Sequence, residues 1–301
     1  MKKHKTAHHK YIVANNTDEL WGLFVTTIGL QLTPPDVPYP SKDHPSAYWF
    51  DPGTGRILHE YQLIYVTKGE GIFQSAHCGS IKICAGSVIM LFPEEWHTYR
   101  PDKKTGWEVY WIGFNGSNID RLLDNYFFSK SQPVMDIGFN ENLIGLYRQG
   151  IDIANYQKTA FQAMLAGIAQ LLLGAVFYID KNNSFRDKDV ITRIDQARVL
   201  IRENIDRGQA LEEIASQLNM SYSWFRRLFK QYTGFAPAQY QLEIKIQKAK
   251  ELLASTAMPV KEIAYELNFE SAGYFITFFK SKTGISPKAY RNKVRPNPYK
   301  Q

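Results

Sequence analysis

An internal repeat in the last third of the chain is the feature that most constrains the fold. The pattern Glu-Ile-Ala, followed by Leu and Asn, occupies residues 213–219 and recurs 49 residues later at residues 262–268. Past a short turn, further pairs recur at a spacing of 50 residues: Phe225 and Phe275, Phe229 and Phe279, Lys230 and Lys280, Gly234 and Gly284, Pro237 and Pro287, Tyr240 and Tyr290. The second copy therefore has one extra residue in its turn. Such a repeat predicts one supersecondary unit built twice.

Each copy fits a helix-turn-helix, a short helix and a second helix joined by a tight turn and closed by glycine. Between the copies, residues 237–256 predict one connecting helix of about 18 residues, or about 27 Å at 1.5 Å per residue. That length is comparable with the roughly 34 Å between successive major-groove faces on one side of DNA. The expected helices span about 210–218 and 222–232 in the first copy, and about 259–267 and 271–282 in the second.

The second helix of the first copy has two distinct faces. Helical spacing places Phe225, Leu228 and Phe229 on the inward face, and Ser223, Arg226, Arg227 and Lys230 on the outward face. An arginine there can fork onto a guanine edge or a phosphate. Residues 186–301 hold 20 Lys and Arg against 12 Asp and Glu, a net charge of +8, whereas the rest of the chain nets −1. Repeat, turn and charge together favour DNA contact over a merely solvated basic face.

At these residues the chain resembles the AraC/XylS family of bacterial transcription regulators. The motifs are IAxxL, MSYSWFRRLFKQYTG, KIQKAKELL and PVKEIAYELNFESAGYFITFFKSKTGISPKAYR, which together cover residues 190–295. The resemblance implies an AraC-type double helix-turn-helix domain and a set of DNA-binding positions. These positions are Ser223, Arg226 and Arg227 in the first copy and Ala272, Gly273, Ile276 and Thr277 in the second; we add Ser221, Lys230, Ser271 and Lys280 to the expected DNA-binding residues.

The second copy departs from the more polar members of that family. Its outward positions, among them Ala272, Gly273, Ile276 and Thr277, carry neither Gln nor Arg. We expect this helix to grip the DNA backbone through Ser271, Lys280 and Lys282, with Ile276 or Thr277 touching thymine methyls. Asn268 replaces the family's usual glycine, and since asparagine tolerates positive φ the turn should form. Lys245 replaces the usual arginine in the connecting helix and cannot make a forked contact.

The first half of the chain predicts a different architecture. Residues 58–114 read as strands and turns, and residues 119–130 and 140–180 then take helical periodicity. The expected fold is therefore α+β and multidomain, with a cupin-like β-barrel or sandwich followed by a helical dimerisation segment, and an all-α C-terminal domain. The expected parts are an N-terminal arm at 1–45, the cupin-like domain at 46–180, a linker at 181–189 in which Asn182-Asn183-Ser184 breaks the helix, and the double helix-turn-helix at 190–295.

The run YQLIYVTKGEG…AGSVIMLFPEEWH resembles the cupin-like sugar-sensing domain of arabinose-type regulators. The resemblance implies sugar contacts from Tyr99 and Trp111, with Arg56, Tyr65 and His97 as further ligand-binding candidates. Val109 stands where the arabinose sensor has a histidine, which puts the same sugar in doubt. The alternative that the aromatic residues only fill a barrel stays open. A metal-dependent cupin needs several convergent ligands and His97 alone occupies such a place, so we expect no metal and no cofactor.

Residues 160–179 form an uncharged stretch of nearly membrane-spanning length. Its apolar residues nevertheless recur at three- and four-residue spacing, which favours a buried or dimerising helix over a membrane span. The stripe comprises Phe161, Met164, Ile168, Leu171, Ala175 and Tyr178. Asp18 and Glu19 interrupt the segment after the basic start, which predicts no signal peptide. Cys78 and Cys84 are expected to be reduced thiols, and the protein to be cytoplasmic.

Together these patterns predict a ligand-responsive, sequence-specific transcription regulator, an activator of a carbohydrate-utilisation pathway. Its expected partners are double-stranded DNA, a sugar-like effector, RNA polymerase and a second copy of the chain. A proline-rich stretch, Pro34, Pro35, Pro38, Pro40 and Pro45, suggests an arm over the pocket. The alternative is a cupin-type enzyme or carbohydrate-binding protein with a DNA-binding tail. It is disfavoured because the sequence shows no nucleophile–base pair, no paired metal ligands, no P-loop and no dinucleotide fingerprint; we expect no catalytic residues.

Overall fold

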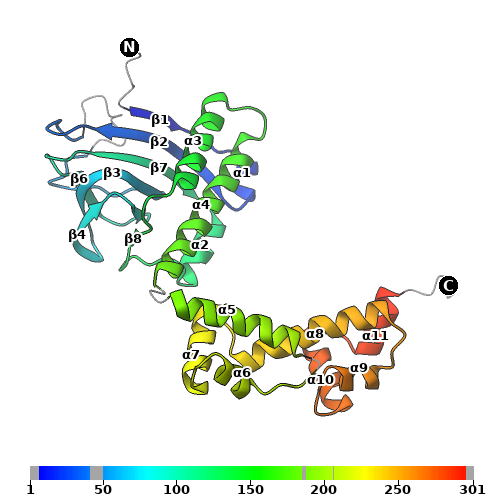
Figure 1. Ribbon diagram of the computed structural model, residues 1–301. Helices are drawn as coiled ribbons and strands as arrows, with labels where there is room; N and C mark the ends of the chain where they lie inside the picture. Colours follow the sequence, from blue (N-terminus) through cyan, green and yellow to red (C-terminus); the bar gives the residue numbers. More distant parts are fainter. Residues whose placement is uncertain (1–6, 41–49, 185–187, 206, 296–301) are drawn as a thin grey trace. The chain divides into compact units, whose positions relative to one another are not determined.

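The computed structural model describes residues 7–40, 50–184, 188–205 and 207–295. The chain divides into two compact units, residues 1–184 and 185–301, which are considered separately (Figure 1). Pro45 of the expected arm lies outside the described residues. The first unit carries the strands and the second is helical, so the expected α+β class with an all-α C-terminal part is confirmed.

The first unit is built on antiparallel strands in the order β1-β2-β7-β3-β5-β8. The long strand β3 takes part twice, because its first half pairs with β5 and β7 and its second half, from Glu70 onward, pairs with β4 and β6. The sheet therefore curls over itself and encloses an interior. Its strands are β1 (Ala7–Tyr11), β2 (Phe24–Thr33), β3 (Tyr61–Ser75), β4 (Cys78–Cys84), β5 (Ser87–Leu91), β6 (His97–Pro101), β7 (Trp107–Asn115) and β8 (Val134–Asp136).

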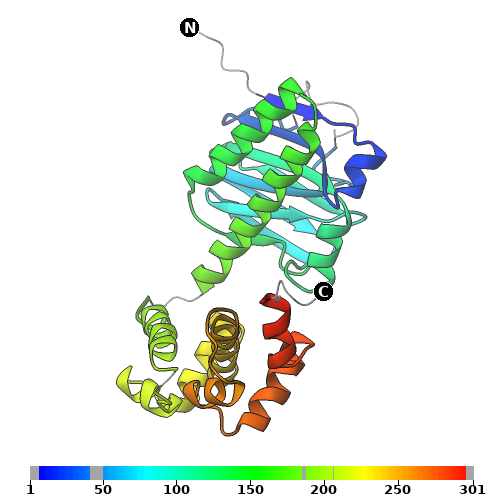
Figure 2. The same cartoon turned by 90° about the vertical axis from the view of Figure 1, so that its right-hand side faces the viewer.

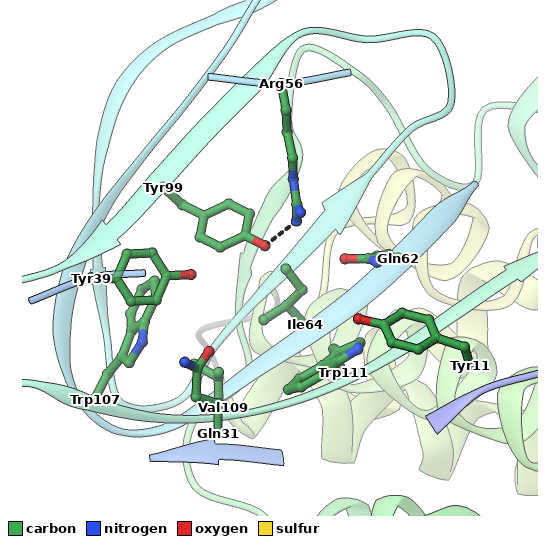
Figure 3. Close-up of a pocket in the computed structure, with 10 residues that line it drawn as sticks. All are labelled: Tyr11, Gln31, Tyr39, Arg56, Gln62, Ile64, Tyr99, Trp107, Val109 and Trp111. Carbon is green, nitrogen blue, oxygen red and sulfur yellow. Dashed lines mark hydrogen bonds between the residues drawn. The ribbon is translucent and has the colours of Figure 1, made fainter. Parts of the chain in front are cut away.

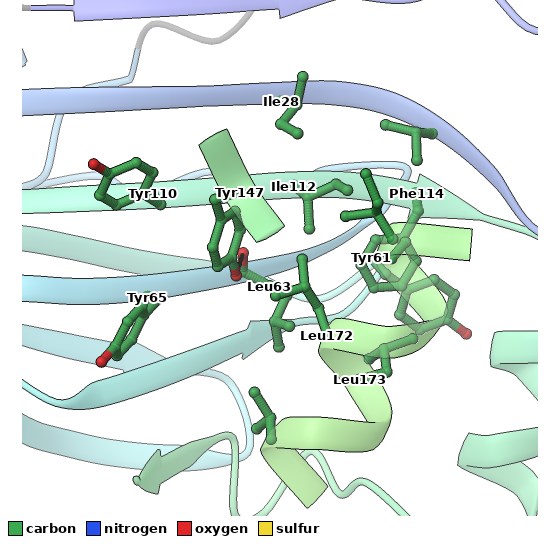
Figure 4. Packing of buried hydrophobic residues seen from close by; sticks show 14 of the residues in the cluster. Ile28, Tyr61, Leu63, Tyr65, Tyr110, Ile112, Phe114, Tyr147, Leu172 and Leu173 are labelled. Carbon is green, nitrogen blue, oxygen red and sulfur yellow. Dashed lines mark hydrogen bonds between the residues drawn. The ribbon is translucent and has the colours of Figure 1, made fainter. Parts of the chain in front are cut away.

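Side chains alternate between the two faces of this sheet, because successive residues of a strand point to opposite sides. On β3, Tyr61, Leu63 and Tyr65 belong to the core beneath the helices, whereas Ile64 and Val66 belong to the enclosed interior. The first core is drawn in Figure 4, where Tyr65, Tyr110 and Tyr147 lie with Leu63, Ile112 and Leu172. The helices of this unit are α1 (Asn16–Leu20), α2 (Ser117–Asp124), α3 (Glu141–Tyr156) and α4 (Phe161–Ser184).

Helices α3 and α4 cover one face of the sheet (Figure 2). Asn140 caps α3 by accepting from the backbone N–H groups of Asn142 and Leu143. By length and composition α4 is apolar enough to cross a membrane, but Leu165, Leu172 and several neighbours are buried in the core against the sheet. It is therefore a packed helix of this unit, but the face that packs is not the predicted stripe, since Met164, Leu171 and Tyr178 of that stripe are exposed.

The linker expected at 181–189 begins too early, because α4 continues to Ser184. Two asparagine side chains hold this last turn in place. The Asn182 amide donates to the Tyr178 carbonyl, and the Asn183 amide donates to the Asp136 carbonyl at the end of β8. These residues, expected to break the helix, bond its end instead.

The expected arm at 1–45 also differs from the structure. Residues 7–33 contribute β1, α1 and β2, and β2 pairs with β7 from Phe24 to Thr33. This stretch is thus part of the sheet, because strand pairing with distant β7 is a non-local contact that the sequence pattern did not reveal. The segment after Thr33, which leads to Tyr39 and Pro40, is irregular and belongs to no strand or helix.

The second unit consists of two three-helix groups, each with its own core, followed by a short helix. The first group is α5, α6 and α7, and the second is α8, α9 and α10. The predicted helix-turn-helix pairs and the connecting helix are confirmed within one or two residues. The helices are α5 (Lys188–Glu203), α6 (Leu211–Gln217), α7 (Tyr222–Thr233), α8 (Pro237–Ser255), α9 (Val260–Glu266), α10 (Ala272–Thr283) and α11 (Pro287–Val294).

Matching residues end and begin the helices of the two groups. Ser221 and Ser271 cap α7 and α10 through their side chains, and Gly234 and Gly284 end these helices at φ of 80° and 78°. The turns before them pass through Asn219 at φ 53° and Asn268 at φ 49°. The expectation that asparagine adopts positive φ at position 268 is confirmed.

Each turn also receives a cation from the first helix of its group. Lys245 of α8 donates to the Asn268 carbonyl at 2.7 Å and lies 5.2 Å above the Phe269 ring. Arg193 of α5 occupies the corresponding place, 3.5 Å from the Asn219 carbonyl. Burial lowers the pKa of Lys245. Lys245 therefore supports the turn from inside the fold.

Candidate DNA interface and ligand pocket

The outward face of α7 is formed by the residues that the sequence assigned to it. Ser223, Arg226, Arg227 and Lys230 are exposed, while Phe225 and Phe229 are fully buried against α5 and α6. Ser221, the remaining candidate, bonds the Trp224 backbone N–H as the helix cap. The packing of the two phenylalanines fixes the rotation of the helix, so both arginines point to solvent from one side of it.

The matching face of α10 is exposed as well, at Ser271, Gly273, Ile276, Thr277 and Lys280. Ser271 is the helix cap. Lys282, expected on the DNA backbone, instead contacts Glu243 of α8 and lies 5.8 Å from the centre of the Phe278 ring. The two helices thus share a geometry but not a chemistry, because α10 presents one lysine where α7 presents two arginines and a lysine.

A small cavity lies inside the curled sheet of the first unit (Figure 3). Its volume is about 30 Å³, which is room for no more than a few water molecules. Three of the predicted ligand-binding residues line it, Arg56, Tyr99 and Trp111. The other lining residues are Tyr11, Gln31, Tyr39, Gln62, Ile64, Trp107 and Val109.

Arg56 is held at the cavity wall by aromatic and polar neighbours. Its guanidinium donates to the Tyr99 hydroxyl, lies 4.5 Å above the centre of the Phe50 ring, and approaches His97 Nε2 at 3.4 Å. Burial raises the pKa of Tyr11 to about 12 and that of Tyr39 well above its ordinary value. Both phenols therefore keep their protons near neutral pH and can donate hydrogen bonds.

Trp111 packs directly against strand β2 at residue 29, where only a glycine leaves room for the indole. A Cβ at Gly29 would overlap the indole ring and come within 2.6 Å of the His8 carbonyl. The strand register agrees with this contact, because Trp111 of β7 pairs with Gly29 of β2 on one side and with Ile64 of β3 on the other. An indole face seated in this way is suited to stacking on the C–H surface of a sugar.

Two predicted ligand residues, Tyr65 and His97, do not line the cavity. Tyr65 follows Ile64 on β3 and so points to the opposite face, where its hydroxyl donates to the Gly138 carbonyl and accepts from the Asn140 N–H. His97 is buried behind Arg56, parallel to the Tyr99 ring at 6.1 Å. His97 therefore contacts Arg56 and Tyr99, which do line the cavity.

Sequence reasoning missed Gln31 and Gln62, two buried amides that line the cavity. A signal was present for one of them: Gln62 is the one amide residue in the run YQLIYV, and it alternates with the residues that face the helices. Tyr11 and Tyr39 were missed because they come from distant segments, β1 and the stretch after β2.

Comparisons with known proteins agree with this division of the chain. A family described as AraC-like ligand binding domain matches residues 47–178, and a helix-turn-helix domain family matches residues 214–293. The MmsAB operon regulatory protein of Pseudomonas aeruginosa is 25% identical, over 78% of this chain and 76% of that protein. The Msm operon regulatory protein of Streptococcus mutans is 24% identical, over 86% and 92%. The lactose operon transcription activator of Staphylococcus xylosus is 26% identical, over 78% and 85%.

The fold and the two sites define a DNA-binding transcription regulator with a separate ligand-binding domain. Two features carry this conclusion, the doubled helix-turn-helix and the aromatic cavity in a curled sheet. The chain belongs to the AraC family of regulators.

Proposed function

We propose that the chain binds a sugar in the cavity of its first unit and, as a homodimer in the cytoplasm, activates transcription of a carbohydrate-utilisation operon together with RNA polymerase. The observation that supports a sugar most directly is the Trp111 indole, seated on Gly29 beside Arg56 and Tyr99. The lactose operon activator of Staphylococcus xylosus is a relative over most of both chains.

The small volume of the cavity has a consequence for this proposal. Only about 30 Å³ of the cavity is wide enough for the centre of a water-sized sphere, so we expect a wall to move when a sugar ring enters. Tyr39, which stands between Pro38 and Pro40, is our candidate for that movement; its ring centre lies 5.6 Å from that of Trp107. We therefore restrict the proposed arm over the pocket to residues 34–40. The residues before them form β1 and β2 of the sheet, so a deletion of residues 1–40 would remove these strands as well.

In the second unit, we propose that α7 reads bases through Ser223, Arg226 and Arg227, and that α10 contributes mainly backbone contacts through Lys280. The difference in exposed charge between the two helices supports this division. Each base-reading arginine should contribute about 1–3 kcal/mol of discrimination between the correct base and a wrong one. Each phosphate contact should add about 0.9 to the magnitude of the slope of log K for DNA binding against log salt concentration.

The test is a salt titration of the full chain on the DNA upstream of its own gene, with and without a panel of sugars. Arg226→Ala and Arg227→Ala should each weaken binding to the specific site about tenfold or more. Each should also lower the ratio of the affinity for this site to the affinity for unrelated DNA. Arg202→Ala, which removes the same charge from the exposed side of α5, is the matched control. Specific binding that is unchanged in both α7 variants would contradict the assignment.

A further inference from the structure

Two glutamines on neighbouring parts of the sheet face the cavity from buried positions. Gln31 of β2 is 7% exposed and Gln62 of β3 is 3% exposed. Strand β7 lies between these strands and contributes Val109 and Trp111 to the same wall. The two amides therefore flank the indole face.

The side-chain amide of Gln31 has no hydrogen-bond partner among the residues that the structure describes. The Gln31 amide is reached by solvent from the cavity, so its hydrogen bonds are made to water or to a ligand rather than lost. The indole N–H of Trp107, which also lines this cavity, is buried and has no partner within the described part of the chain. The Gln31 amide thus offers a donor and an acceptor to a polar ligand.

Gln62 is oriented by a carboxylate behind it. Its Nε2 donates to Glu60 Oε1 at 2.6 Å, and Glu60 also accepts from the hydroxyls of Thr26 and Thr27. All three neighbours donate, so Glu60 acts only as an acceptor and keeps the NH₂ group of Gln62 turned towards itself. The carbonyl oxygen of Gln62 is then the atom left to face the cavity, among the residues drawn in Figure 3.

We propose that Gln31 and Gln62 determine ligand specificity, with Glu60 as the positioning residue that makes Gln62 a hydrogen-bond acceptor. The ligand must then donate a hydroxyl hydrogen to Gln62 Oε1 while its C–H face stacks on Trp111. This inference rests on the proposed sugar sensing and adds the requirement for a hydroxyl donor at one defined position.

The first experiment is calorimetric titration of the full chain with L-arabinose, D-xylose, D-galactose and lactose. For the sugar that the wild type binds most tightly, Gln31→Met and Gln62→Met should each weaken binding about tenfold or more. Gln74→Met is the matched control, because Gln74 lies on the same strand β3 but is exposed. Gln31→Met should melt no lower than the wild type, since it removes an amide that has no partner within the described residues.

The second experiment separates positioning from structural support. A deoxyfluoro derivative of the bound sugar cannot donate a hydrogen bond at the fluorinated position. When fluorine replaces the hydroxyl that meets Gln62, the wild type should bind the derivative about tenfold more weakly than the sugar itself. Glu60→Gln keeps the volume but introduces a donor, which lets Gln62 turn its NH₂ group to the cavity. The discrimination against fluorine should fall in this variant, whereas a purely structural loss would weaken both ligands equally.

The outcomes are distinct. Weakened binding in the two Met variants, together with lost fluorine discrimination in Glu60→Gln, supports the proposal. Binding within twofold of the wild type in correctly folded Gln31→Met and Gln62→Met overturns it while leaving sugar sensing intact. Failure of the wild type to bind any of the four sugars contradicts the proposed sensing of them, and this inference with it.

Discussion

His97 shows how a residue outside the cavity can hold its wall in place. Its ring is buried, its Nδ1 bonds the Glu95 carbonyl at 3.0 Å, and its Nε2 faces the Arg56 side chain. Burial first, and the charge of Arg56 second, lower the pKa of His97 to about 4. The neutral ring with its proton on Nδ1 is therefore the form that fits, because Nε2 must accept from Arg56.

This environment predicts a stability that depends on pH. Between the folded pKa of about 4 and the unfolded value of 6.5, the unfolded state binds more protons, so the free energy of unfolding rises with pH. Lowering the pH from 7 to 5 should cost about 2 kcal/mol through this residue. Urea unfolding followed by tryptophan fluorescence measures it. His97→Gln should reduce the pH effect by that amount, and an equal pH effect in the wild type and in His97→Gln would refute the argument.

The contact between the Trp111 indole and Gly29 gives a second prediction for a single residue. Gly29→Ala places a methyl group where the indole and the His8 carbonyl already lie, so the ring or strand β1 must shift. We expect a loss of about 1–3 kcal/mol in stability and weaker binding of the sugar that the wild type binds. Gly79→Ala is the control, because a Cβ there meets nothing within 4 Å. Thermal melting and calorimetry of both variants would decide, and wild-type behaviour of Gly29→Ala would show that this contact is not needed.

At the scale of elements, local patterns predicted the helices well and the strand pairing poorly. The turns at Asn219 and Asn268, the caps Ser221 and Ser271 and the glycine stops are encoded within a few residues, so the helix-turn-helix units could be found from sequence. Strand β2 could not be found in this way, because its position is set by pairing with β7, which lies far along the chain. The same limit applies to the pocket, because its lining residues come from strands β1, β2, β3, β6 and β7 and from the segments that hold Tyr39 and Arg56.

Helix α4 presents an apolar stripe to solvent within the described structure. Met164 and Leu171 are 55% exposed and Tyr178 is 68% exposed, at a spacing of seven residues. Such spacing is that of a helix–helix seam. We expect Leu171→Glu to convert a dimer to monomers in sedimentation equilibrium, with the folded state retained. Gln149→Glu adds the same charge on the exposed side of α3 and should leave the dimer intact. A wild-type protein that is monomeric at all concentrations tested would contradict the dimer.

At the scale of the whole molecule, the regulator needs a coupling between the cavity in the first unit and the arginines of α7 in the second. Coupling of this kind is reciprocal: if a sugar raises affinity for DNA by some factor, saturating DNA raises affinity for that sugar by the same factor, commonly about 5- to 150-fold. We therefore expect calorimetric titration with the sugar to give tighter binding when the upstream DNA is present. The double variant Arg226→Ala and Arg227→Ala should bind the sugar as the free wild type does, with or without that DNA, because it no longer forms the specific complex. Equal sugar affinities of the wild type with and without saturating DNA would mean that the two sites do not bias a common pair of states, and the ligand would then have to act on transcription after the DNA is bound.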